Sequence, residues 1–150
     1  MQTFLPFESF DETARVLDYR RLGKQRVECK QILLSIIYDR GWNHHPIVRM
    51  WRGYECCLID YAKTICKEWI RRGYKDSVLL WLNEFEHSYD FKRYNVFNID
   101  SWCNKDYRPG WLGNKDFHLS HQSNLLRKDF DYYSTKGFWT KDDSLPYLWF

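Results

Sequence analysis

The chain has 150 residues, of which 44% are apolar, 29% charged and 19% aromatic, and its formal net charge is +3. This length fits one domain covering residues 1–150, and so many aromatic residues are not typical of a disordered chain. No apolar run approaches the roughly 18 residues needed to span a bilayer, and the first residues lack the layout of a signal peptide. We therefore expect a cytoplasmic protein that neither spans nor binds a membrane.

The five cysteines are odd in number, two are adjacent, and none forms a C-x-x-C pair. Neither a disulfide framework nor a zinc ribbon fits this spacing. We expect reduced, mostly buried thiols at Cys29, Cys56, Cys57, Cys66 and Cys103.

The hydrophobic spacing predicts a mainly α fold: a compact single-domain helical bundle with a long ordered loop region and an aromatic C-terminal tail. A capping box at residues 9–12 predicts a short helix that reaches about Leu17. A second helix is expected from about Tyr19 to Tyr38, with Gly41 ending it. Its buried side is expected to hold Leu22, Cys29, Leu33 and Ile36, with Val27 and Leu34 widening the stripe.

Pro46 suits the first turn of a helix, and the longest periodic segment of the chain follows it. Its apolar residues recur at three- and four-residue steps and predict one core face, ended by Gly73, that holds Trp51, Tyr54, Leu58, Ala62, Ile65 and Trp69. Gly53 then lies inside a helix, where it costs about 1 kcal/mol against Ala, and close approach of another backbone is one reason for it.

Two further helices are predicted in the second half of the chain. Asp76 or Ser77 should cap a shorter helix that includes residues 78–82, and a last helix should begin after Asn114. The segment 87–113 has no regular period and is expected to be irregular.

The most informative segment for chemistry lies around Glu28. On a helix, Arg21, Lys24, Glu28 and Gln31 share one face, so Glu28 is a single carboxylate among cations. Such a group suits the stabilisation of a developing cation or the activation of water. The alternative is an ordinary surface pair between Lys24 and Glu28 that contributes a few tenths of a kcal/mol.

Two other clusters combine histidines with cations. The first, near a predicted helix N-terminus, holds His44, His45, Arg49 and Arg52, which suits contact with a phosphate. In the second, His118 and His121 share a helix face and Arg127 and Lys128 follow. Neither histidine pair has the spacing of a zinc motif, so we expect no metal and no cofactor, and phosphate contact is the favoured interpretation.

At these clusters the sequence resembles the pyrimidine-dimer DNA glycosylase family, the small helical phage-type endonuclease V enzymes and their bacterial relatives. The resemblance rests on four motifs between Met1 and Asp129: MQTFLP, LGKQRVE, HHP-x-x-x-MWRGYE, and WLG followed by H-x-SHQSNLLRKD. Within the family it more closely resembles a bacterial and phage branch.

The resemblance implies removal of a damaged or modified pyrimidine from duplex DNA by an N-terminal amine, with Schiff-base formation, strand nicking and a flipped base. The family's catalytic Glu falls on Glu28, and the amine belongs to the first residues, Met1, Gln2 or Thr3. Gln2 is bulky enough to hinder removal of Met1, so the Met1 amine is the expected nucleophile. Val27 stands where the family has an Arg directly before its Glu, which leaves a water-mediated reaction without lyase activity as a variant.

Further contacts with DNA are expected from basic, histidine and amide side chains, and no obligate protein partner is expected. Phosphates are assigned to Lys24, Arg26, Arg49, Arg52, Arg127 and Lys128, and the pocket wall to His44, His45, His118 and His121. Arg21 and Asn124 are expected to make further contacts with the substrate or DNA. Two other interpretations stay open: a non-catalytic nucleic-acid or nucleotide binder on the same scaffold, and an enzyme that acts on a modified nucleotide.

Overall fold

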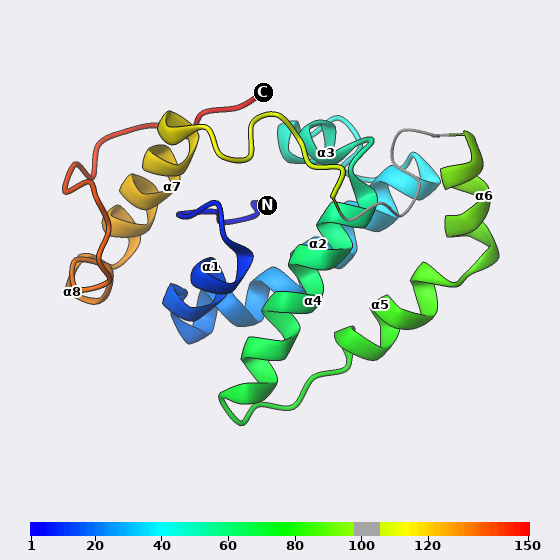
Figure 1. Cartoon of the computed structure of the whole chain (residues 1–150), viewed down its shortest axis with the longest axis horizontal. Coiled ribbons are helices and arrows are strands. Elements are labelled where there is room, and N and C mark those ends of the chain that lie inside the picture. The colour runs from blue at the N-terminus through cyan, green and yellow to red at the C-terminus, as the bar shows by residue number, and fades with distance from the viewer. Residues whose placement is uncertain (98–105) are drawn as a thin grey trace.

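A computed structural model describes residues 1–97 and 106–150, apart from the side chains of residues 95–97; the prediction for Cys103 lies outside this part. Within it, the regular elements are helices, which confirms the predicted mainly α class (Figure 1). They are α1 (Phe10–Val16), α2 (Tyr19–Tyr38), α3 (Pro46–Trp51), α4 (Glu55–Arg71), α5 (Val78–Glu86), α6 (Tyr89–Phe97), α7 (Lys115–Lys128) and α8 (Phe130–Tyr133). None of the helices in the described ranges is both long and apolar enough to cross a bilayer.

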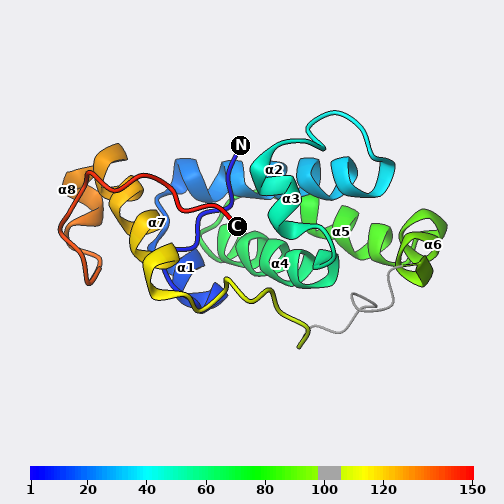
Figure 2. The ribbon, with the colours of Figure 1, turned by 90° about the horizontal axis from the view of Figure 1, so that it is seen from above.

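Helices α2 and α4 pack against each other at the centre of the molecule, and α1 lies against α4. Helices α5 and α6 extend this centre at one end, while α7 and α8 stand together at the other end (Figure 1). Both chain termini come to the middle of the molecule, near α3, as the two views in Figures 1 and 2 agree. The first and last residues therefore meet the surface of the same central helices.

Side-chain capping occurs at the three helix starts where the sequence predicts it, those of α1, α5 and α7. The Ser9 hydroxyl accepts a hydrogen bond from the Glu12 amide at 3.2 Å, and Asn114 Oδ1 accepts one from Phe117 at 3.0 Å. For α5, the residue before the helix is Ser77, but the capping hydrogen bond goes to Asp76 Oδ2, from the Leu79 amide at 2.8 Å. Each bond satisfies an amide that the first turn of a helix leaves without an intrahelical acceptor.

Helix α2 has the predicted bounds, but two details of its prediction are wrong. Asp39, in the left-handed conformation at φ 47°, ends the helix, and Gly41 belongs to the turn that follows. Val27 is 45% exposed instead of buried. It precedes Cys29 by two residues, which places it about 200° round the helix from that buried side chain. The predicted stripe of Leu22, Cys29, Leu33 and Ile36 is confirmed as buried.

The predicted single helix after Pro46 is two helices, α3 and α4, separated at residues 52–54. Gly53 has φ +89°, and a Cβ there would meet no atom within 4 Å. Close approach of another backbone is therefore the wrong reason for this glycine. It is suited to the turn because it takes a backbone conformation that other residues adopt only with strain.

Two helices were not predicted. Helix α6 occupies part of the segment expected to be irregular; the Ser88 hydroxyl accepts from the Phe91 amide at 3.2 Å, and the Phe91 ring is fully buried. Helix α8 is a single turn in which Asp129 caps the Tyr132 amide and Tyr133 is buried. In both, a buried aromatic ring stabilises a segment with a weak local signal. Among the described cysteines, the expectation of burial is confirmed for Cys29, Cys56, Cys57 and Cys66.

Candidate active site

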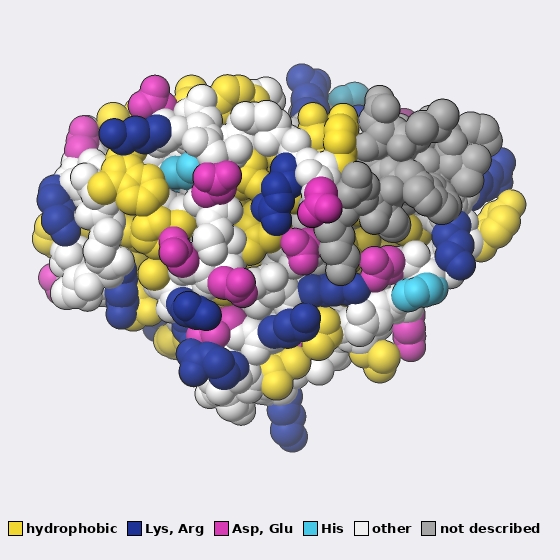
Figure 3. Space-filling view, viewed as in Figure 1, with side chains coloured by type: hydrophobic (Ala, Val, Ile, Leu, Met, Phe, Trp, Pro, Cys, Tyr) yellow, Lys and Arg dark blue, Asp and Glu magenta, His cyan; other side chains and the backbone are white. Residues whose placement is uncertain are grey.

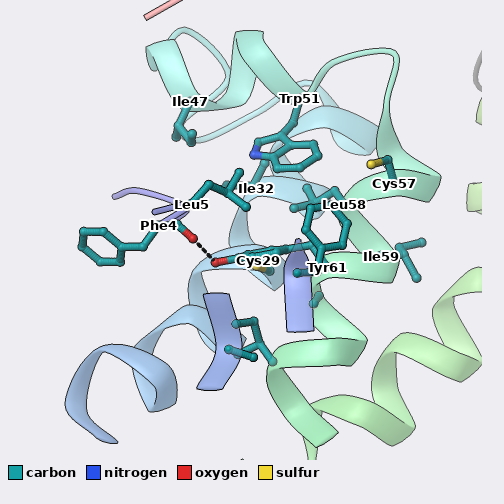
Figure 4. Close-up of a cluster of buried hydrophobic side chains, with 14 of the residues drawn as sticks. Phe4, Leu5, Cys29, Ile32, Ile47, Trp51, Cys57, Leu58, Ile59 and Tyr61 are labelled. Atoms are coloured by element: carbon teal, nitrogen blue, oxygen red, sulfur yellow. Dashed lines mark hydrogen bonds between the residues drawn. The ribbon is translucent and has the colours of Figure 1, made fainter. Parts of the chain in front are cut away.

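The first residues of the chain run in extended conformation through the middle of the molecule, and side chains satisfy their backbone groups. The Gln25 carboxamide donates to the Gln2 carbonyl at 2.7 Å and accepts from the Phe4 amide at 3.0 Å. The Tyr61 hydroxyl donates to the Phe4 carbonyl at 2.7 Å (Figure 4). The cluster in Figure 4 joins Leu5 to buried side chains of α2, α3 and α4. Together these contacts fix where the N-terminus lies.

Two histidines of α7 hold both backbone groups of Leu5. His121 Nδ1 accepts from the Leu5 amide at 3.1 Å, and His118 Nδ1 lies 2.8 Å from the Leu5 carbonyl oxygen. His118 Nε2 accepts from the Gly113 amide, so its Nδ1 carries the proton and donates to Leu5. Burial lowers the pKa of His118, and burial with the neighbouring His118 lowers that of His121 to about 3. Both rings are therefore neutral at pH 7, and they position the N-terminal segment instead of lining the pocket.

Glu28 lies on α2 directly beside this segment and is only 6% exposed. Its Oε2 accepts from Gln25 Nε2 at 3.1 Å and lies 3.4 Å from the Gln2 backbone nitrogen. Its Oε1 lies 3.5 Å from the Lys24 ammonium. The alternative interpretation is an exposed surface pair between Lys24 and Glu28. The structure instead shows a buried carboxylate with three nitrogen neighbours, of which the Lys24 ammonium is only one.

These groups surround a hollow of about 390 Å³, a volume in the range of small-molecule sites. Its wall combines the chain's first residues, the outer face of α2, one histidine, a lysine of α7 and two aromatic residues of the tail. It is lined by Met1, Gln2, Phe4, Arg20, Arg21, Lys24, Glu28, His45, Lys128, Tyr147 and Trp149. Among these lining residues Glu28 is the one acidic side chain, so the hollow favours an anionic ligand.

The charges in the hollow act on one another. Burial and the neighbouring cations Arg21, Arg127 and Lys24 lower the pKa of Lys128. Burial and the positive charge of the N-terminus lower the pKa of His45. His45 Nδ1 accepts from the Ile47 amide at 3.1 Å and caps α3, which leaves the Nε2 proton as its free donor. The N-terminal amine and Glu28 are thus both close enough to His45 to affect its pKa electrostatically.

The C-terminal tail supplies the aromatic wall, and polar side chains of α7 hold it in place. The Ser123 hydroxyl accepts from the Leu145 amide at 2.9 Å, and Asn124 Nδ2 donates to the Leu145 carbonyl at 3.1 Å. Arg127 donates to the same carbonyl at 3.2 Å. Beyond this anchor, burial raises the pKa of Tyr147 to about 12. Its phenol is therefore a neutral hydrogen-bond donor in the hollow.

The structure brings six of the predicted site residues to the hollow besides Glu28: Met1, Gln2, Arg21, Lys24, His45 and Lys128. It places the others elsewhere. Thr3 is fully buried, and its hydroxyl accepts from Trp51 Nε1 at 2.9 Å. Arg26 pairs with Asp76 beneath the Trp69 ring, and Asn124 and Arg127 bind the tail. Three more predicted site residues are exposed and lie outside the hollow: His44, Arg49 and Arg52.

Sequence reasoning missed Gln25, Arg20, Phe4, Tyr147 and Trp149. Gln25 precedes Glu28 by three residues, so helical spacing alone could have placed it on the same face. Nothing in local spacing connects Phe4 or the tail residues with Glu28, because those contacts join distant parts of the chain. Within the described residues no group of three or more His, Cys, Asp or Glu side chains is arranged to hold a metal ion.

Comparisons with known proteins point to one family. The family model described as pyrimidine dimer DNA glycosylase matches residues 1–82, which include the N-terminal segment, Glu28 and His45. No curated protein and no solved structure matches the chain. The matched region covers more than half of the sequence, and the chain belongs to the pyrimidine dimer DNA glycosylase family.

Proposed function

We propose that this protein is a DNA glycosylase that excises a damaged or modified pyrimidine from duplex DNA and uses its N-terminal amine and Glu28. One observation carries the proposal: Glu28 Oε2 lies 3.4 Å from the Gln2 backbone nitrogen inside a hollow bordered by Arg20, Arg21 and Lys24. A carboxylate next to the start of a chain suits amine chemistry at a sugar carbon, and the cations suit the flanking phosphates.

The hollow has room for one extruded nucleoside, which enzymes of this class must take out of the base stack. The aromatic rings of Tyr147 and Trp149 offer faces against which a base can stack. Lys24 and Lys128 both line the hollow, one from α2 and one from α7, and suit the phosphates next to the extruded sugar.

The reaction begins when the neutral α-amine attacks C1′ of the deoxyribose. The glycosidic C–N bond breaks, and the base leaves with the bonding electron pair and takes up a proton. The carboxylate of Glu28 stabilises the positive charge that develops on the sugar. The sugar ring then opens to an imine between C1′ and the amine, and loss of a C2′ proton expels the 3′ phosphate and nicks the strand.

The amine belongs to Met1 if the initiator residue stays, or to Gln2 if it is removed. Met1 lines the hollow, and the Gln2 nitrogen already lies beside Glu28, so either terminus suits the reaction. In the variant without lyase activity, Glu28 activates a water molecule that attacks C1′, and the amine contributes only its charge.

The test combines base release with covalent trapping. Purified protein is incubated with a duplex that carries one cyclobutane pyrimidine dimer, with and without borohydride, which reduces an imine to a stable adduct. We expect the wild type to break a glycosidic bond of the dimer, which is measured as an alkali-labile strand break because the cyclobutane ring keeps the detached base joined to its neighbour. We also expect an adduct mapped by mass spectrometry to the first residue, and a loss of both signals of roughly a hundredfold or more in Glu28→Gln. The exposed Glu84 provides the control, because Glu84→Gln should leave both unchanged.

The outcomes separate the alternatives. Base release without an adduct selects the water mechanism. Salt-sensitive binding of duplexes without release from any lesion-bearing duplex overturns the proposal and selects a non-catalytic binder. Turnover of a free modified nucleoside, with binding that does not depend on ionic strength, selects a nucleotide-directed enzyme.

A further inference from the structure

The cluster of His44, Arg49 and Arg52 is not used by the hollow, although its neighbour His45 lines it. His44 lies in the segment 39–45, which connects α2 with α3, while Arg49 lies on α3 and Arg52 directly follows it. Figure 2 shows this connection standing out beyond the helices on the side of the molecule where the N-terminus lies. It therefore lies on the side of the molecule to which the N-terminal segment, a part of the wall of the hollow, also comes.

The 39–45 segment forms a turn that has its own internal hydrogen bonds. Asp39 has φ 47° and Gly41 has φ 67°, and Asn43 Nδ2 donates to Asp39 Oδ1 at 2.8 Å. The His45 amide donates to the Trp42 carbonyl at 2.8 Å. Two left-handed residues and two hydrogen bonds within seven residues hold the tip of the turn in one orientation.

The turn presents Trp42 to solvent. Its side chain is 58% exposed, more than that of any other tryptophan in the described ranges. The Trp42 ring meets the edge of the His45 ring with centroids 6.0 Å apart, and His45 in turn lies 6.1 Å from Trp149. The His45 ring, which lines the hollow, therefore connects Trp42 with it.

Three arginines lie on or beside this turn, with Asp39 as an acid within it. Arg40 lies over the Tyr38 ring at 5.0 Å, Arg49 is exposed, and Arg52 lies 3.7 Å from Asp39. An exposed large aromatic side chain among guanidinium groups fits a nucleic acid better than an apolar protein surface, because the cations pair with phosphates while the ring stacks on bases.

We propose that Trp42 is the wedge that enters the base stack next to the extruded nucleotide, while Arg49 and Arg52 hold the adjoining phosphates. The inference rests on the proposed function and adds the element that opens the duplex. Proteins that kink DNA insert apolar side chains between base steps, and the unstacking they cause helps to expel the neighbouring base. The wedge fills the space that the expelled base leaves.

The test measures base extrusion separately from base release. A duplex carries 2-aminopurine beside the lesion, and its fluorescence rises when it becomes unstacked. We expect wild-type protein to raise this signal and Trp42→Ala to lose most of the increase, with roughly tenfold slower base release. Trp42→Phe should restore part of both, because a smaller ring still stacks. Trp139, 48% exposed near Phe7, provides the matched control, and Trp139→Ala should behave as wild type.

A second substrate separates the wedge from general loss of activity. When the lesion lies opposite a gap, no partner base resists extrusion, and Trp42→Ala should release the base at close to the wild-type rate. A full 2-aminopurine signal in Trp42→Ala overturns the proposal, and so does an equal loss of activity on both substrates. If wild-type protein unstacks 2-aminopurine through Trp42 but releases no base, the proposed function fails and the wedge stands.

Discussion

At the scale of the residue, Gln25 connects the parts of the site. Its side chain is fully buried, and Nε2 donates to the Gln2 carbonyl and to Glu28 Oε2. Its Oε1 accepts from the Phe4 amide and lies 2.8 Å from the Tyr61 hydroxyl. Both N–H donors of the carboxamide and one lone pair of its oxygen are therefore in use. Gln25 therefore sets the position of the carboxylate relative to the N-terminal segment.

Gln25→Glu removes both donors and brings a second negative charge next to Glu28. We expect the free energy of unfolding to fall by about 2–4 kcal/mol at pH 7, because a carbonyl and a carboxylate lose their partner in a buried place. The loss relative to wild type should be smaller at pH 4.5, where a protonated carboxyl donates again. Urea denaturation at both pH values checks this, with the exposed Gln31→Glu as a control that changes stability by less than about 0.5 kcal/mol.

His121 makes stability depend on pH. Its pKa is lowered to about 3 in the folded protein, mainly by burial, against about 6.5 in an unfolded chain. Between these values the unfolded state binds more protons, so the contribution of His121 is fully present above about pH 6.5 and is lost as pH falls toward 3. We expect a slope of about 1.4 kcal/mol per pH unit from this group.

Denaturation midpoints between pH 7 and pH 4 check that slope. His121→Asn keeps an acceptor for the Leu5 amide but does not titrate, so its stability should change less with pH than that of wild type. His87 is exposed, and His87→Gln should keep the wild-type slope. An unchanged slope in His121→Asn would contradict the assignment.

At the scale of the element, α2 and α4 approach each other at Gly23. A Cβ at this position would lie 2.9 Å from Cη2 and Cζ3 of Trp69. The Trp69 ring cannot easily move away, because it stacks on Tyr74 with centroids 4.2 Å apart and lies under the Arg26 guanidinium. Glycine is therefore required at position 23 because α2 and α4 approach closely there, and not because the backbone forms a turn.

Replacement of a helical glycine by alanine usually stabilises a helix by about 1 kcal/mol. In Gly23→Ala we expect the opposite sign, a loss of about 1–3 kcal/mol from overpacking against Trp69. Thermal or urea unfolding measures the change. In a Trp69→Leu background, Gly23→Ala should cost less stability than it does in the wild-type background, because the smaller side chain leaves room for the added methyl group. Stabilisation by Gly23→Ala in the wild-type background would refute the contact.

At the scale of the whole molecule, the distribution of charge matters more than the total of +3. The hollow beside the N-terminus gathers Arg20, Arg21, Lys24 and Lys128 around one acid. The face in Figure 3, with α4 and α5 in front, instead shows basic and acidic side chains interspersed. Between α1 and α4, for example, Lys67 and Arg71 lie with Asp11 and Glu68 around one shallow hollow.

This distribution predicts the salt dependence of duplex binding. We expect Lys24→Ala and Lys128→Ala each to weaken binding across sequences and to reduce the slope of log K against log salt by about 1, because each loses one phosphate contact. Fluorescence anisotropy at several salt concentrations provides the slopes. Lys67→Ala, on the mixed-charge face, is the control and should keep the wild-type slope.

The sequence by itself determined most of the helices, because capping and hydrophobic spacing act over a few residues. It also placed Arg21, Lys24 and Glu28 on one face of α2, since helical periodicity alone sets that relation. It failed at Gly53, where a left-handed turn splits a continuous apolar pattern, and at α6 and α8, where buried rings outweigh a weak local signal.

Only the tertiary structure decided what Glu28 meets. The Leu5 amide and the His121 ring are 116 positions apart, yet their hydrogen bond helps to bring the N-terminus beside the carboxylate. The same packing uses His118 and His121 as backbone partners and brings Tyr147 and Trp149 from the tail to the hollow. Periodicity describes only one element at a time, so relations between distant segments depend on how the helices pack and on which buried polar groups find partners.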